Sequence, residues 1–315
     1  MWGTSEKQIN RLFNETMNGI GKSRHFDKEI ARKDGAISFR NMAKKTNIYS
    51  YGTADTYLPY WKNLADFAKK NKGIKDIEKI SNRTVKEFLQ SKIRDINCKS
   101  TFSKISSAIL KMEESLNRYS QKNGSEKSYN WEKIVDNQRE ISKEKLNNSI
   151  EGRGFNNPKL VIDNLPLNNE NHILAAKIQH ESGVRINEVS LIKKKQLSGI
   201  GKDPYNEKDV GIVTVKGKGG KTREVYLTPE TYKSLENNVK NDDFKIAKTS
   251  YTLAIKEAAL SSNQVYTGTH DFRHKWVQDR YIELSKIGFS ERQSMAAVSE
   301  EIGHVRPDIT EVYLK

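Results

Sequence analysis

The stretch "HDFRH", from His270 to His274, combines two histidines and an arginine within five residues. Two histidines four residues apart lie on one face of a helix, which is the spacing of two ligands in many zinc hydrolases. Those enzymes place a glutamate beside the first histidine as general base, whereas this chain has the shorter Asp271. A zinc site here, with His304 as a third ligand, would also leave Arg273 without a role. We therefore favour an interpretation that uses Arg273.

That second interpretation is a site for phosphate. His270 and Arg273 are three residues apart, so they share one helical face and form a pair of hydrogen-bond donors. The chain supplies more groups of this kind in Arg185, Lys218, His304 and Tyr313. Two guanidinium forks suit the non-bridging oxygens of a phosphodiester, and a lysine or histidine can protonate a leaving alkoxide. A tyrosine can attack phosphorus and be held as an ester, so together these residues predict a metal-free phosphoryl transfer.

Lys218 lies in "KGKGGKT", which ends like the phosphate-binding loop of nucleotide-binding proteins. That loop needs a glycine where this chain has Val215, and a helix where "REVYLT" predicts a strand. The alternating pattern of residues 210–228 predicts a β-hairpin with a glycine-rich turn instead. A solvated turn lysine would fit the same pattern, but with the other groups present we expect Lys218 to reach a ligand lying across the sheet.

Four segments of the chain resemble the tyrosine recombinases, a family that includes phage integrases, Xer chromosome-dimer resolvases and integrases of conjugative elements. They are "SGVRINEVSLIKKKQL", "VKGKGGKTREVYLT", "HDFRH" and "EIGHVRPDITEVYLK". Tyr313 follows His304 at an offset of nine residues, as the family pattern requires. The resemblance covers about residues 155–315, and residues 50–122 have a weaker likeness to the family's helical core-binding domain.

The resemblance implies a role for each matching residue. The catalytic set would be the arginines Arg185 and Arg273, the lysine Lys218, the histidines His270 and His304, and the tyrosine Tyr313. The arginines would clamp the scissile phosphate, and the lysine would act as general acid toward the departing 5′ oxygen. The histidines would assist proton transfer and contact the phosphate, and the tyrosine would form a 3′-phosphotyrosyl link.

Other residues would support this set. Glu188 matches an acidic position that buttresses the family's site, and Lys216, Lys221 and Arg223 are expected to contact DNA. His274 is expected to pack or hydrogen-bond locally. Because the phosphotyrosine conserves the energy of the broken bond, the resemblance implies no cofactor, neither ATP nor a metal.

The elements that position these residues predict a mainly α fold with a small antiparallel β-sheet. We expect an N-terminal extension (1–49, a helix plus a basic segment), a helical core-binding domain that clamps DNA (50–150) and a catalytic domain (151–315). The Asn- and Gly-rich segment 147–158 is the expected linker. Thr53 is a candidate N-cap for the first helix of the core-binding domain. Residues 171–197 predict a helix, a break at Gly183 and a second helix that ends in a basic run.

Charge indicates a polyanionic partner. The 315 residues carry a net charge of +15, with an isoelectric point near 9.5. Residues 1–150 hold 30 Lys and Arg against 18 Asp and Glu, whereas residues 151–315 hold 25 against 22. A low-GC genome, which favours Lys and Asn codons, is an alternative explanation of the charge. The single cysteine, Cys98, excludes an internal disulfide, and with no signal peptide or long apolar run the sequence predicts a cytoplasmic protein.

These features favour a site-specific DNA recombinase that integrates or excises a mobile element or resolves dimers. Its partners would be double-stranded DNA with inverted-repeat sites, further copies of itself in a tetramer on that DNA, and an accessory protein, with no membrane involved. One alternative is a type IB topoisomerase-like enzyme that nicks and closes DNA without pairing sites. Another is a DNA-binding protein whose catalytic residues are inactive, against which the complete catalytic set argues.

The charge asymmetry generates a prediction about binding. DNA affinity should fall on the order of a thousandfold or more between about 50 and 200 mM salt if six or more phosphates are neutralised. A fragment of residues 155–315 should bind far more weakly than the whole chain, because most of the excess charge lies in the first half. Fluorescence anisotropy with a labelled duplex measures both quantities. Equal affinity of fragment and whole chain would contradict the assignment of the clamp to residues 1–150.

Overall fold

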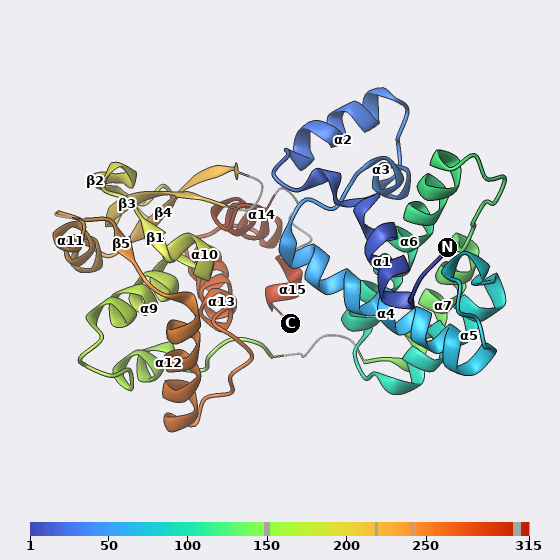
Figure 1. Ribbon diagram of the computed structural model, residues 1–315. Coiled ribbons are helices and arrows are strands. Elements are labelled where there is room, and N and C mark those ends of the chain that lie inside the picture. Colours follow the sequence, from blue (N-terminus) through green and yellow to red (C-terminus); the bar gives the residue numbers. More distant parts are fainter. Residues whose placement is uncertain (148–151, 218–219, 241, 305–309, 315) are drawn as a thin grey trace. The chain divides into compact units, whose positions relative to one another are not determined.

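The chain divides into two compact units, Met1–Ser149 and Ile150–Lys315. Figure 1 shows the computed structural model, which describes residues 1–147, 152–217, 220–240, 242–304 and 310–314. Each unit has its own hydrophobic core. No helix within the described ranges is both long and apolar enough to cross a membrane. The roles expected of the three segments 1–49, 50–150 and 151–315 stay predictions.

The first unit is built from helices. They are α1 (Ser5–Asn14), α2 (Arg24–Lys33), α3 (Phe39–Lys45), α4 (Tyr51–Lys72), α5 (Asn82–Asp95), α6 (Lys99–Lys122) and α7 (Glu132–Lys145). The fully buried Trp61 of α4 donates from Nε1 to the carbonyl of Ala108 in α6 at 2.7 Å. Phe13 of α1 packs edge-on against the Trp61 ring, with ring centroids 4.9 Å apart. The first helix therefore shares the core of the helices that follow it.

Helix α4 begins slightly earlier than the sequence pattern predicts. Ser50 is its N-cap, and the Ser50 hydroxyl accepts a hydrogen bond from the main-chain N–H of Thr53 at 3.2 Å. Thr53 is thus the third residue of the first turn, and the prediction that it caps the helix is wrong. Serine and threonine are both good N-caps, but an N-cap residue must have extended backbone. Ser50 has it, whereas Thr53 is already helical.

The second unit combines helices with two small antiparallel sheets (Figure 1). Its helices are α8 (Pro158–Asp163), α9 (Glu170–Ser182), α10 (Ile186–Val189), α11 (Pro229–Asn238), α12 (Lys248–Ser261), α13 (Asp271–Lys286), α14 (Glu291–Glu301) and α15 (Glu311–Leu314). Its strands are β1 (Leu191–Ile192), β2 (Leu197–Lys202), β3 (Asp209–Lys216), β4 (Thr222–Leu227) and β5 (Phe244–Lys245). The expected mainly α fold with a small antiparallel sheet is confirmed.

The predicted hairpin consists of β3 and β4. Val213 pairs with Val225 and Lys216 with Thr222, and β2 adds a third strand on the other side of β3. Alternate residues of the hairpin are buried in the core of the unit. Helix α11 packs so tightly on the sheet that a Cβ atom at Gly211 would lie 2.2 Å from the Tyr232 side chain. The hairpin is thus anchored at its base, and its tip carries the glycine-rich turn.

The helix predicted after Gly183 is much shorter than expected. Helix α10 has only four residues, because the chain becomes extended at Ile192, which pairs with Phe244 in the sheet of β1 and β5. The basic run that follows begins at the extended Lys193, the N-cap of a single turn of 3₁₀-helix, Lys194–Gln196. A pairing partner fifty residues away therefore overrides the local helical pattern.

Candidate active site

Arg185 is positioned by a sharp turn between α9 and α10. Gly183 ends α9 with a φ of +61°, and a Cβ atom there would lie 2.7 Å from the Trp276 ring, so only glycine fits. Arg185 follows as the N-cap of α10, and its main-chain N–H donates to Glu188 Oε2 at 2.8 Å. Its Nη1 donates to the other carboxylate oxygen of Glu188 at 2.9 Å. Both the main chain and the side chain of Arg185 are therefore fixed by Glu188.

Glu188 also binds a second guanidinium. Arg223 of β4 donates from Nη1 and Nη2 to the two carboxylate oxygens at 3.0 and 2.9 Å. Burial alone would raise the pKa of Glu188, but the hydrogen bonds and charge of Arg223, with those of Arg185, lower it to about 2. Arg223 was expected to contact DNA. Its Nε also donates to the carbonyl of Glu301 at 2.8 Å, so this placement favours a positioning role.

Arg273 lies in the first turn of α13 and is completely buried. Its Nη1 donates to the carbonyl of Gly183 at 2.7 Å, its Nη2 to the carbonyl of Ile302 at 2.6 Å, and its Nε to Tyr313 Oη at 3.3 Å. Burial lowers the pKa of Arg273 to about 10, which leaves it charged at neutral pH. The plane of this guanidinium is thus set by two main-chain carbonyls and by the phenol that the sequence pattern predicts as nucleophile.

Tyr313 lies in the short helix α15, with its ring against the start of α13. Its Oη is 3.5 Å from His270 Nε2, and its ring centroid is 4.6 Å from that of His274. Its main-chain carbonyl accepts a hydrogen bond from Gln278 Nε2 at 3.0 Å. The expectation that His274 packs locally agrees with these contacts, because the ring of His274 is buried against the tyrosine.

His304 completes the group. It follows α14, where its main-chain N–H donates to the carbonyl of Ser299 at 2.8 Å, and its Nε2 lies 3.3 Å from Arg185 Nη2. Burial, followed by the charge of Arg273, lowers the pKa values of His270 and His304 to about 4. Both imidazoles are therefore uncharged at neutral pH, and each ring keeps one nitrogen that can accept a hydrogen bond.

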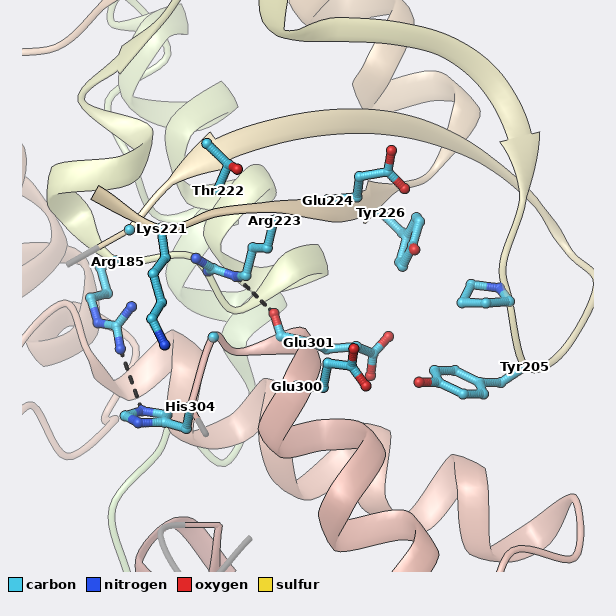
Figure 2. Close-up of a pocket in the computed structure, with 13 residues that line it drawn as sticks. Arg185, Tyr205, Lys221, Thr222, Arg223, Glu224, Tyr226, Glu300, Glu301 and His304 are labelled. Carbon is cyan, nitrogen blue, oxygen red and sulfur yellow. Dashed lines mark hydrogen bonds between the residues drawn. The ribbon is translucent and has the colours of Figure 1, made fainter. Parts of the chain in front are cut away.

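A cavity of about 500 Å³ opens beside Arg185 and His304 (Figure 2). The hairpin and the end of α14 line its walls, and the side chain of Lys221 extends along it toward His304. Lys216 is exposed at the end of β3. The predicted general acid, Lys218, lies outside the described residues. On the described part of the hairpin, the carbonyl of Lys221 accepts a hydrogen bond from the Gly217 N–H at 2.7 Å.

The structure thus brings together the five described residues of the predicted catalytic set, which are Arg185, His270, Arg273, His304 and Tyr313. Chemically, they combine two fixed cations, two neutral imidazoles and one phenol, and the ring centroids of His304 and Tyr313 are 6.2 Å apart. Within the described ranges, no three His, Cys, Asp or Glu side chains gather as a potential metal site.

A buried ion cluster behind the site was missed by the sequence analysis. Arg280, two turns after Arg273 on α13, bonds to Asp203 and to Glu301, both at 2.8 Å. Burial opposes the charge, but the hydrogen bonds and charge of Glu301, with Asp203, raise the pKa of Arg280 above its usual value. Because Glu301 also holds Arg223 through its carbonyl, this cluster fixes the end of α14. Arg280 could have been found from its spacing, because a residue seven positions after Arg273 lies on the same face of the helix.

The Glu188 carboxylate generates a prediction about stability. Replacement Glu188→Gln should lower the free energy of unfolding at pH 7 by about 3 kcal/mol, because it leaves two partly buried guanidinium groups without their anion. The pKa of Glu188 is lowered on folding, so its stabilisation is present above about pH 4.5 and is lost as pH falls toward 2. The difference between variant and parent should therefore shrink below about pH 4.5. Urea titrations across this range measure it.

The matched control is Glu236→Gln, a change at an exposed carboxylate on α11. This variant should unfold like the parent protein at every pH. If Glu188→Gln is as stable as the parent at pH 7, Glu188 does not hold the two arginines as described.

No family model matches the sequence, and no curated protein matches it. Among solved structures, the chain is similar to the XerH site-specific recombinase bound to a palindromic difH substrate, with a TM-score of 0.63 and 17% identity over 99% of this chain and 90% of that one. It is also similar to the Tn1549 transposon integrase in complex with circular intermediate DNA, with a TM-score of 0.52 and 13% identity over 100% and 96% of the two chains. The chain has the fold of the tyrosine recombinases.

Proposed function

We propose that this protein is a site-specific DNA recombinase that cleaves and rejoins DNA through a 3′-phosphotyrosyl intermediate. The observation that carries the proposal is the position of Tyr313 Oη, 3.3 Å from Arg273 Nε and 3.5 Å from His270 Nε2. A phenol beside a fixed cation and a neutral imidazole is suited to attack a phosphodiester. Arg185 and His304, 3.3 Å apart, offer a second pair of donors to the same phosphate.

The proposed reaction proceeds in two steps. Tyr313 Oη attacks the scissile phosphorus, and the bond from phosphorus to the 5′ oxygen breaks. The phenol proton passes to His270, whose protonated form is stabilised by the negative charge of the bound phosphate. Lys218 delivers a proton to that oxygen, which leaves as a 5′ hydroxyl. In the second step a 5′ hydroxyl attacks the phosphotyrosine, the phosphodiester is restored and Tyr313 is released. The number of phosphate ester bonds is unchanged, so the reaction needs no ATP. The two arginines supply the charge stabilisation that a metal ion would otherwise give.

The two arginines stabilise the charge that develops on the phosphate. Arg185 is held by Glu188, and Arg273 by the carbonyls of Gly183 and Ile302, so neither has to be reoriented during the reaction. Donors that are preorganised in this way contribute strongly to catalysis of charged transition states. His304 supports Arg185 and contributes a further phosphate contact.

The wider role proposed is recombination in the cytoplasm, on double-stranded DNA with inverted-repeat sites. The two similar structures are a site-specific recombinase and a transposon integrase, each bound to DNA, and this supports integration, excision or dimer resolution over simple relaxation. A tetramer on DNA and an accessory protein are parts of the same proposal. The second candidate, a type IB topoisomerase-like enzyme, would use the same residues but would not join two sites. An inactive DNA-binding protein is the third.

The covalent step is tested with Tyr313→Phe. The variant keeps the ring that packs on His274 but lacks the attacking oxygen, so DNA binding should persist and cleavage should disappear. The test duplex is one selected from a randomised pool for its denaturant-resistant adduct with the unaltered protein, and gel electrophoresis detects the adduct. The adduct should also form in excess EDTA. An adduct with Tyr313→Phe would overturn the assignment of the nucleophile.

The DNA product then distinguishes the recombinase from the topoisomerase-like enzyme and from the inactive binding protein. A recombinase exchanges strands between two copies of the test duplex, whereas a nicking and closing enzyme relaxes supercoiled DNA without exchange. An inactive binding protein forms no adduct with any duplex of the pool.

The general-acid role of Lys218 is tested by changing the leaving group of the DNA substrate. Lys218→Ala should slow cleavage by roughly 10²–10⁴-fold with little change in affinity, the range for loss of a general acid. A substrate whose 5′-bridging oxygen is replaced by sulfur has a leaving group that needs no proton. Lys218→Ala should cleave this DNA nearly as fast as the unaltered protein.

Lys221→Ala is the matched control on the same hairpin. Its side chain is expected to contact backbone phosphate, so it should lose affinity, and sulfur should not rescue it. If sulfur rescues Lys221→Ala instead of Lys218→Ala, the two roles have been exchanged.

A further inference from the structure

The segment that enters the second unit lies directly against the start of α13. Phe155 is buried and meets the ring of Phe272 edge-on, with centroids 4.8 Å apart. Gly154 has a φ of +115°, and a Cβ atom there would lie 3.1 Å from the main-chain nitrogen of Lys275 and 3.3 Å from the Cβ of His274. The positive φ favours glycine at this position, and the short distances show that the segment packs closely on α13. This close packing fixes the residue before it, Arg153, beside the helix that carries His270 and Arg273.

A single side chain joins Arg153 to the nucleophile. Gln278 Nε2 donates to the carbonyl of Arg153 at 3.1 Å and to the carbonyl of Tyr313 at 3.0 Å. An amide group has two N–H donors, so Gln278 can satisfy both carbonyls at once. The main chains of Arg153 and Tyr313 are therefore held on either side of one nitrogen atom.

The guanidinium of Arg153 lacks a counterion in the described part of the chain. Its Nε is buried and has no hydrogen-bond partner there. Its positive charge contributes to lowering the pKa values of both His270 and His274, for which burial is the largest cause. Buried cationic donors are normally paired, so a buried Nε that has no partner among the described residues, and whose charge acts on His270, indicates an anion that arrives from outside.

Arg273 cannot supply all the hydrogen bonds that a reacting phosphate can accept. Arg273 directs one N–H of Nη1, one of Nη2 and its Nε–H at protein acceptors, and it is completely buried. A guanidinium has five N–H donors, so at most two of them remain for a phosphate. The phosphorus centre under attack carries more negative charge on its non-bridging oxygens than the resting phosphodiester does. A further donor on the side of Tyr313 would share that charge.

We infer that Arg153 is a third guanidinium that contacts the non-bridging oxygens of the reacting phosphate. The inference rests on the proposed function, and it adds a residue from the first segment of the second unit to the reaction centre. Gly154, Phe155 and Gln278 hold the main chain of Arg153 in place, and the phosphate supplies the missing partner of its side chain.

The test compares Arg153→Gln and Arg153→Lys with the unaltered protein in single-turnover cleavage of the test duplex, at protein concentrations that saturate binding. Arg153→Gln should cleave about 10²–10³-fold more slowly, the loss typical of one donor to a developing anion. Arg153→Lys keeps the charge but not the fork, and it should recover part of this loss. The control Arg292→Gln removes an exposed arginine of α14 in the same unit and should cleave at the parental rate.

A neutral phosphate distinguishes charge stabilisation from structural support. When one non-bridging oxygen at the cleavage position is replaced by a methyl group, the reacting centre carries one negative charge less. On this methylphosphonate duplex the deficit of Arg153→Gln should shrink to within a few-fold of the unaltered protein. A structural defect would slow both substrates equally.

The experiments distinguish failure of the proposed function from failure of the role of Arg153 alone. If the unaltered protein forms no adduct with any duplex of the pool, the proposed function fails and the role of Arg153 with it. If the unaltered protein forms the adduct and Arg153→Gln matches its rate, only the role of Arg153 fails. An equal deficit on the phosphodiester and the methylphosphonate also overturns it, since Arg153 would then act on folding or on a distant part of the DNA.

Discussion

The candidate site depends on one carboxylate placed between two guanidinium groups. Glu188 is almost fully buried, and it accepts hydrogen bonds from the main chain and side chain of Arg185 and from both Nη atoms of Arg223. These bonds join α10 to the hairpin. Since Arg223 also donates to the carbonyl of Glu301, the same carboxylate is linked to the end of α14 and hence to His304. Three segments that are far apart in the sequence meet through it.

The arrangement also answers an electrostatic problem. A site that binds a phosphate must hold several cations close together before the anion arrives, and their repulsion opposes folding. The structure limits this repulsion in two ways. Glu188 neutralises part of the charge near Arg185, and the nearby histidines stay neutral because burial and the arginines lower their pKa values to about 4. The charge of Arg280 adds little to this repulsion, because Arg280 is paired with the carboxylates of Asp203 and Glu301.

Much of this site could be predicted from local patterns, and the rest depends on tertiary contacts. The spacing of His270 and Arg273, the offset from His304 to Tyr313 and the alternation of the hairpin are all properties of short segments. The length of α10 could not be predicted in the same way, because it is set by the pairing of Ile192 with a strand fifty residues later. The contacts of Arg223 with Glu188 and with the carbonyl of Glu301 could not be predicted either. They join segments that are far apart in the sequence, so no local pattern encodes them.

The contacts that hold Tyr313 share one origin. Its ring packs on His274, its Oη accepts a hydrogen bond from the Nε of Arg273, and its carbonyl accepts one from the amide of Gln278. All three residues belong to α13. A displacement of this helix would therefore move the guanidinium and the phenol together, so the distance between them is insulated from movements elsewhere in the second unit.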